Sequence, residues 1–132
     1  MNDARQKPDR SSLARRLWSF RHAFRGLAFL LSTQANARIH ALATLLVIAV
    51  GIVFNLSVIE WCAIVGACGL VWMAEALNTA VESLVDLVSP DHHPLAGRAK
   101  DVAAGGVLAA AMSAAVIGMF IFGPRLLALL SH

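Results

Sequence analysis

Charged residues are scarce in this sequence, and so are the motifs of soluble enzymes. Only 14% of the 132 residues are charged, whereas 58% are hydrophobic, and the mean hydropathy is +0.69. The chain has no glycine-rich phosphate loop, no protein-kinase signature, no Rossmann fingerprint and no nucleophile elbow. These absences exclude the common nucleotide-binding and hydrolase classes. The composition is that of a protein embedded in a lipid bilayer.

Cysteines are equally few, and their positions exclude a disulfide framework or a zinc site. Cys62 and Cys68 are six residues apart within an apolar segment. On a helix that spacing places the two thiols on different faces, where they neither pair nor share a metal ion.

Positive charge is concentrated at the start of the chain. The net charge is +3, and eight of the eleven Lys and Arg residues precede Ala41. In a chain this apolar, such asymmetry is a topology signal that places the N-terminus in the cytoplasm, and we expect no nucleic-acid partner. We expect no signal peptide either, because residues 1–12 are polar and the first long apolar run begins near Ile39.

A helical stripe precedes the apolar runs. Its apolar members recur at steps of three and four residues: Leu13, Leu17, Phe20, Phe24, Leu27 and Leu31. Basic residues are interleaved with them: Arg15, Arg16, Arg21, His22 and Arg25. This pattern predicts an amphipathic helix over about 10–33 that lies at the membrane surface.

Three apolar stretches follow the surface helix. They predict transmembrane helices over about 38–57, 60–88 and 100–122, each able to cross a hydrocarbon core of roughly 30 Å. The first link carries no basic residue, whereas the second carries Arg98 and Lys100. We therefore expect an all-α, multi-pass bundle in one membrane domain spanning residues 1–132, with the second link in the cytoplasm.

A polar stripe interrupts the second apolar stretch. Glu75, Asn78, Glu82 and Asp86 lie within about an 80° arc of a helix. A carboxylate at the depth of Glu75 costs about 3 kcal/mol or more on insertion scales, so it is expected to face the bundle interior and to be functional. The alternative is a neutral Glu75, hydrogen-bonded between helices, in a stripe that only orients the bundle.

The link after this stretch gathers cations near a helix start. Residues 89–94 predict a turn that contains the His92-His93 pair, which we interpret as solvated surface. Arg98 and Lys100 follow Pro94, which suits a first helical position, so the segment is a candidate anion site. Taken alone, the two cations are more typical of topology anchors than of an anion site. Beside carboxylates that hold Mg²⁺, they favour phosphoryl transfer.

Two segments carry a resemblance to a known family. Residues 75–86, EALNTAVESLVD, and residues 93–101, HPLAGRAKD, resemble the prokaryotic diacylglycerol kinase and undecaprenol kinase family. The resemblance extends from about Arg25 through the third apolar stretch. It implies a homotrimeric lipid kinase of phospholipid or polyprenyl-phosphate metabolism in the bacterial inner membrane. ATP with Mg²⁺ would bind on the cytoplasmic side, and the lipid alcohol would enter from the bilayer.

The resemblance also implies residue roles. Glu75 matches the general base that deprotonates the lipid hydroxyl, Asn78 matches the residue that orients the reacting groups, and Glu82 matches a Mg²⁺ ligand. Gln34 stands where the family often has a second acidic ligand, so metal affinity is the property most affected. The implied ATP and phosphate site comprises Arg25, Asp86, His93, Arg98, Lys100 and Asp101.

Other functions stay open at this stage. A non-enzymatic membrane protein could use the carboxylate stripe to line a pore or to assemble with partners. A lipid-phosphate phosphatase would act on similar substrates in reverse, although the sequence lacks its nucleophile. Diacylglycerol and undecaprenol both present a primary hydroxyl on a long apolar body, and the sequence does not separate them.

Overall fold

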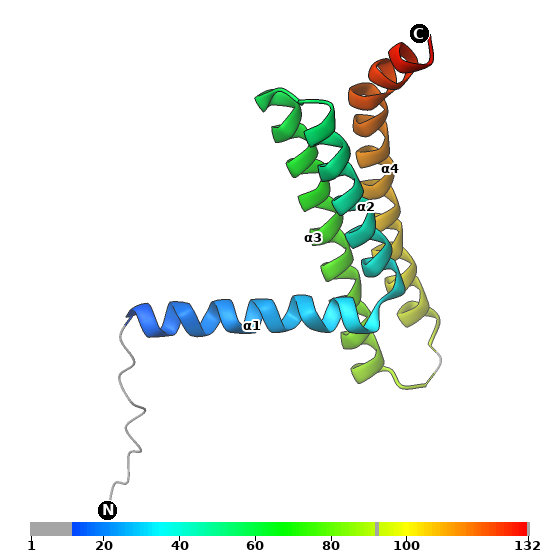
Figure 1. Ribbon diagram of the computed structural model, residues 1–132. Coiled ribbons are helices and arrows are strands. Elements are labelled where there is room, and N and C mark those ends of the chain that lie inside the picture. Colours follow the sequence, from blue (N-terminus) through cyan, green and yellow to red (C-terminus); the bar gives the residue numbers. More distant parts are fainter. Residues whose placement is uncertain (1–11, 92, 132) are drawn as a thin grey trace, which may run out of the picture. The chain divides into compact units, whose positions relative to one another are not determined.

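The chain is almost entirely helical. The computed structural model describes residues 12–91 and 93–131, and within these ranges it contains no β-strand (Figure 1). The four helices are α1 (Ser12–Thr33), α2 (Ala35–Val53), α3 (Val58–Val88) and α4 (Pro94–Leu130). The predicted all-α class is confirmed, including the helix that precedes the apolar segments. The chain divides into two units, Met1–Thr33 and Gln34–His132.

The first unit contains α1, which exposes both kinds of residue in the predicted stripe. Leu17, Phe20 and Phe24 are exposed, as are Arg21 and Arg25. The indole of Trp18 meets the imidazole of His22 edge to face, with ring centroids 4.0 Å apart. The predicted start near residue 10 and the side chains of Leu13, Arg15 and Arg16 lie outside the described residues.

The second unit is a group of three apolar helices. The chain passes up α2, down α3 and up α4, and both α2 and α4 pack against α3 (Figure 1). All three helices are long and apolar enough to cross a membrane, with mean hydropathies of 1.8, 1.6 and 2.1. The beginning of α2, the end of α3 and the beginning of α4 therefore lie at the same end of the unit.

The link between α2 and α3 is defined by two local signals. Asn55 has a left-handed backbone with φ of 49°, a conformation that ends a helix and that asparagine tolerates well. Ser57 then begins α3 with a capping box, in which the backbone N–H of Ser57 donates to the Glu60 carboxylate at 2.8 Å. As a result α2 ends at Val53, whereas the sequence predicted a span to about residue 57.

α4 is longer than the predicted span of about 100–122, and its early start matters for the site. Pro94 occupies its first turn, and Nδ1 of His93 accepts a hydrogen bond from the backbone N–H of Leu95 at 3.2 Å. These two features start the helix at Pro94, the first helical position that the sequence indicated, six residues before the predicted membrane span. Arg98 and Lys100 therefore lie on a helix and not in a flexible link.

An ion pair joins α3 to α4 at the opposite end of the unit. The two guanidinium nitrogens of Arg125 lie 2.9 Å and 3.0 Å from the two carboxylate oxygens of Glu60. Both side chains are partly buried. This two-point geometry fixes the end of α4 against the start of α3.

The outward faces of the second unit are apolar and its interior holds polar groups. Large residues such as Leu45, Val65 and Phe120 are exposed, whereas the fully buried side chain of greatest volume belongs to Glu75. Small residues such as Ala67 and Ala110 occupy the helix contacts. This arrangement suits a lipid environment, where large apolar side chains face the acyl chains.

Candidate active site

Glu75 lines a cavity between α2, α3 and α4. Its side chain is 1% exposed, and its Oε2 atom has no hydrogen-bond partner among the described residues. The cavity has a volume of about 270 Å³, and its polar lining comprises Asn36, His40, Glu75, Asn78 and Glu82. The predicted position of Glu75 inside the bundle is therefore observed, and one carboxylate oxygen is available to a small polar ligand.

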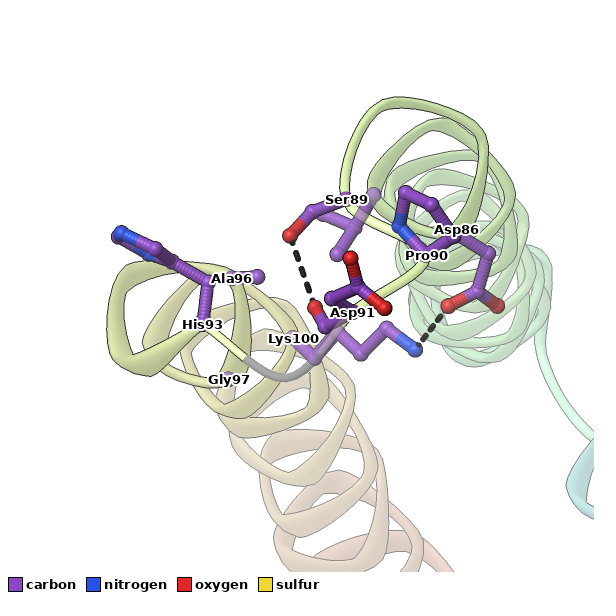
Figure 2. Close-up of a pocket in the computed structure, with 9 residues that line it drawn as sticks. Asp86, Ser89, Pro90, Asp91, His93, Ala96, Gly97 and Lys100 are labelled. Atoms are coloured by element: carbon purple, nitrogen blue, oxygen red, sulfur yellow. Dashed lines mark hydrogen bonds and ion pairs between the residues drawn. The ribbon is translucent and has the colours of Figure 1, made fainter.

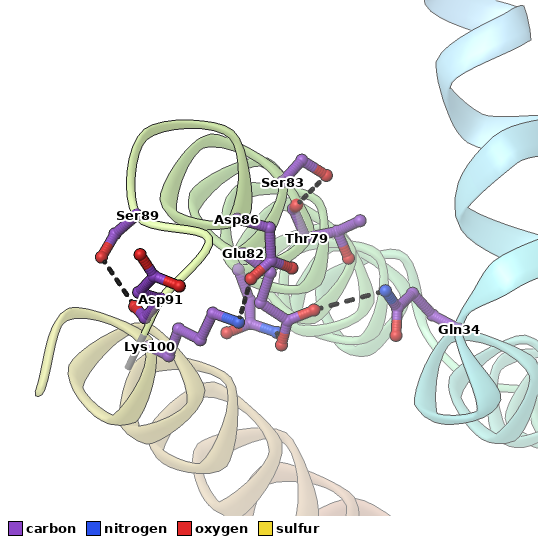
Figure 3. A network of polar contacts seen from close by, with 9 residues as sticks. Gln34, Thr79, Glu82, Ser83, Asp86, Ser89, Asp91 and Lys100 are labelled. Carbon is purple, nitrogen blue, oxygen red and sulfur yellow. Dashed lines mark hydrogen bonds and ion pairs between the residues drawn. The ribbon is translucent and has the colours of Figure 1, made fainter. Parts of the chain in front are cut away.

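Glu82 lies one turn beyond Asn78 and receives two amide groups. Nδ2 of Asn78 donates to its Oε1 at 2.9 Å, and Nε2 of Gln34 donates to its Oε2 at 3.3 Å. Gln34 precedes the first residue of α2, where its side chain caps no backbone group and is free to reach α3 (Figure 3). The structure thus brings together the two residues predicted to be metal ligands.

Asp86, one turn farther along α3, forms a second polar group with Lys100 of α4. Nζ of Lys100 lies 2.6 Å from Oδ1 of Asp86, and the two side chains face each other across a cleft (Figure 2). This cleft has a volume of about 270 Å³ and lies where α3 and α4 meet their link. Within the α3–α4 link, the hydroxyl of Ser89 donates a hydrogen bond to the backbone oxygen of Asp91 at 3.1 Å.

Other predicted nucleotide-site residues are distributed around this cleft. His93 contributes to its lining, but its imidazole points away from Lys100 and caps α4. Asp101 is exposed at the next position of α4 and does not line the cleft. Arg25 is exposed on α1, in the first unit. His92 lies outside the described residues.

Arg98 and Lys100 face different cavities. Residues two positions apart on a helix differ by about 200° in direction. Arg98 accordingly lines a separate groove between α3 and α4. The sequence grouped both cations in one phosphate site. The structure brings Lys100 to Asp86 and leaves Arg98 on the other side of α4.

An apolar cavity adjoins the one that contains Glu75. It has a volume of about 320 Å³ and shares His40 and Ala111 with the Glu75 cavity. Its walls are mostly small apolar residues of α2, α3 and α4. On α2, Thr44 also accepts a hydrogen bond from the indole N–H of Trp72 at 3.2 Å. A buried carboxylate therefore lies beside an apolar space within the membrane segment.

Three residues near the site were not predicted as functional. Ser89 and Asp91 line the cleft of Lys100, and their signal in the sequence was only that of a turn. Thr79 is buried, and its hydroxyl has no partner among the described residues. A helical threonine can donate to a backbone oxygen of the preceding turn, and the sequence alone does not show that Thr79 makes no such bond.

Comparisons with known proteins place the chain among membrane lipid kinases. The model of the family called prokaryotic diacylglycerol kinase matches residues 21–122. The undecaprenol kinase of Bacillus subtilis strain 168 is 43% identical over 120 residues, covering 91% of this chain and 98% of the relative. A diacylglycerol kinase of Synechocystis is 42% identical over 115 residues, covering 86% of this chain and 66% of the relative. That of Escherichia coli K12 is 30% identical, covering 72% and 78%.

Proposed function

This chain belongs to the prokaryotic diacylglycerol kinase family, and we propose that Glu75 is its general base. It is a lipid kinase of the diacylglycerol and undecaprenol kinase type. The non-enzymatic alternative, a pore or an assembly subunit, is not favoured. The observation that carries the proposal is the buried carboxylate of Glu75, whose Oε2 has no partner among the described residues and which lines one cavity with Glu82.

The proposed reaction starts at the free oxygen of Glu75. This oxygen accepts the proton of the lipid's primary hydroxyl as the hydroxyl oxygen bonds to the γ-phosphorus of ATP. The bond between the γ-phosphorus and the bridging oxygen breaks, and ADP leaves with that electron pair. Asn78 supports this step by orienting the neighbouring Glu82 carboxylate at 2.9 Å.

The residues present fit a Mg²⁺ ion at Glu82. Both of its carboxylate oxygens already face side-chain amides, and rotating the Gln34 amide by half a turn would present its oxygen in place of its nitrogen. No group of three His, Cys, Asp or Glu side chains suited to a metal exists within residues 12–91 and 93–131. Magnesium needs no such cage, because it is held by one or two protein oxygens, waters and substrate phosphates. We propose Glu82 and Gln34 as its ligands; when bound, the ion neutralises phosphate charge.

The nucleotide phosphates are proposed to extend from Glu82 toward Lys100. Glu82 and Asp86 are four residues apart on α3, which corresponds to about 6 Å of helix rise. Lys100 lies 2.6 Å from Asp86, so its ammonium would be within reach of a polyphosphate that begins at Glu82. His93 and Asp101 are proposed as neighbours of this site, and Arg25 as a further contributor.

The lipid is proposed to reach Glu75 from within the bilayer. Its hydroxyl would enter the cavity of Glu75 while part of its apolar body occupies the adjoining cavity that shares His40 and Ala111. We further propose that the protein lies in a bacterial plasma membrane with its N-terminus and the α3–α4 link in the cytoplasm, where ATP is present. The oligomer is proposed to be a homotrimer.

A phosphoryl-transfer assay tests the proposal and identifies the substrate. The protein, purified in a mild detergent, would receive γ-labelled ATP and Mg²⁺ with diacylglycerol or a long polyprenol in parallel. We expect labelled lipid phosphate from at least one alcohol and none when ATP is left out. Transfer to neither lipid by a folded protein would contradict the proposal, and release of phosphate from a lipid phosphate without ATP would indicate a phosphatase.

A further inference from the structure

A second lipid-sized space lies between α3 and α4 and is lined by these two helices. It is an open groove with a volume of about 770 Å³. It differs from the cavities of Glu75 and His40, which also have walls from α2. Nothing in the kinase reaction described above uses this groove.

The groove runs along the helices from the end of the bundle into the apolar segment. Val81 and Arg98 line it at the end near the α3–α4 link, whereas Met73 and Gly106 line it deeper. Met73 and Val81 on α3 are eight residues apart, as are Arg98 and Gly106 on α4, which corresponds to about 12 Å of rise along each helix. The groove thus runs in the direction that a lipid chain takes in a bilayer, and its walls include Ala103 and Leu77.

Arg98 supplies a positive charge at the shallow end. Its side chain is exposed, and no ion pair or hydrogen bond engages its guanidinium within the described part of the chain. Lys100, in contrast, is paired with Asp86 on the other side of α4. A guanidinium at the mouth of an apolar groove complements a lipid with an anionic head, and its planar fork matches phosphate in particular.

Asn78 connects this groove with the reaction site. It lines both the groove and the cavity of Glu75. Its side chain is only 7% exposed, yet its Oδ1 atom lacks a hydrogen-bond partner among the described residues. This oxygen accepts hydrogen bonds, so it suits a hydroxyl donor and not the phosphate itself, and the groove adjoins the place where the lipid hydroxyl reacts. The lipid phosphate formed at Glu75 is the anionic lipid generated nearest to this position.

We propose that the groove binds the product class of the reaction, a lipid phosphomonoester, with the phosphate at Arg98 and the apolar chain along α3 and α4. The identity of the anion rests on the proposed kinase function, whereas the existence of the site does not. Arg98 is thus a ligand for a lipid phosphate at a place separate from the nucleotide cleft of Lys100.

Native mass spectrometry of the detergent-purified protein tests the site without turnover. The protein would be incubated, in the absence of ATP, with equal amounts of phosphatidic acid, phosphatidylglycerol and phosphatidylcholine that carry identical chains. We expect phosphatidic acid to be retained preferentially. Arg98→Gln should lower that preference about fivefold, the scale of one exposed ion pair. Arg21→Gln removes an equal charge from α1 and should leave the preference unchanged.

A second variant tests whether the apolar chain of the lipid binds in the groove. An added Cβ at Gly106 meets nothing within 4 Å, so Gly106→Leu should extend into the groove and reduce retention of phosphatidic acid without disturbing the fold. The proposal is overturned if phosphatidylglycerol is retained as well as phosphatidic acid, or if Arg98→Gln leaves the preference intact. It is also overturned if Gly106→Leu alters the oligomer mass but not lipid retention, because a second copy would then occupy the groove. Since ATP is absent, these outcomes are independent of a failure to phosphorylate lipid alcohols.

Discussion

Two carboxylates on the same face of α3 have different surroundings. Glu75 is 1% exposed, and its Oε2 has no partner among the described residues, whereas both oxygens of Glu82 are held by amide nitrogens. A free oxygen on a buried carboxylate suits proton abstraction, and a carboxylate held in a fixed orientation suits a hydrated cation. The proposed division of roles follows from these environments.

Replacing Gln34 by glutamate should increase metal affinity. The side-chain amide of Gln34 lies 3.3 Å from Glu82, so Gln34→Glu would place a second negative charge at the proposed Mg²⁺ position. We expect the Mg²⁺ concentration for half-maximal activity to fall by about one order of magnitude. Without metal, repulsion between the two carboxylates should lower the melting temperature, and Mg²⁺ should restore it. A variant with unchanged magnesium dependence and no such restoration would remove Gln34 from the metal site.

Lys100 is expected to act on nucleotide binding and not on stability. Its pair with Asp86 is partly exposed, with side-chain exposures of 37% and 68%, and such pairs contribute little to folding. Lys100→Gln should raise the KM for ATP by about tenfold, the scale of one charge-assisted hydrogen bond. Lys100→Arg should retain most of the affinity. A KM for ATP that stays at the wild-type value in Lys100→Gln would contradict this role.

At the scale of the helices, the 3.6-residue period predicted α3 better than α4. Glu75, Asn78 and Glu82 were placed on one face by spacing alone, and they line one cavity. For α4 the helix begins at Pro94, which the sequence indicated as a first helical position, and the membrane span predicted over about 100–122 lies within it. The sequence analysis grouped Arg98 and Lys100 in one anion site, although residues two apart on a helix point in nearly opposite directions.

A glycine of α2 lies close to the beginning of α3. A Cβ added to Gly51 would lie 2.8 Å from the Trp61 ring and 3.0 Å from Leu56. Gly51→Ala should therefore destabilise the protein by about 1–3 kcal/mol through overpacking. Gly66→Ala is the matched control, because an added Cβ there meets nothing within 4 Å. Thermal unfolding in detergent measures both, and equal melting temperatures for the two variants would contradict the tight packing.

At the scale of the whole molecule, polar groups occupy the two ends of the second unit. The polar groups of Glu82 and Lys100 lie toward the α3–α4 link, and the ion pair of Glu60 and Arg125 lies at the opposite end. The charge asymmetry of the sequence predicts the orientation in the membrane. The sequence did not reveal the groove of Arg98, because that groove depends on how two separate helices meet.

Thiol labelling in intact cells tests this orientation. In a background of Cys62→Ala and Cys68→Ala, a single cysteine at Val58 should react with a membrane-impermeant maleimide. A single cysteine at Asp91 should react only after the membrane is permeabilised, because the basic arm and the second link are proposed to be cytoplasmic. Labelling of the Asp91→Cys protein in intact cells, with Val58→Cys protected, would reverse the assigned topology.

The central claim is tested most directly by the rate of γ-phosphoryl transfer from ATP to a lipid alcohol in Glu75→Gln. Glu60→Gln, at the far end of α3, removes the same type of charge outside the site and serves as the control. We expect Glu75→Gln to lose about 10²–10⁴-fold in turnover, the range for a general base, while ATP binding and the melting temperature are retained. Glu60→Gln should transfer phosphate at the wild-type rate once it is folded. A folded Glu75→Gln protein with wild-type turnover would show that Glu75 is not the base.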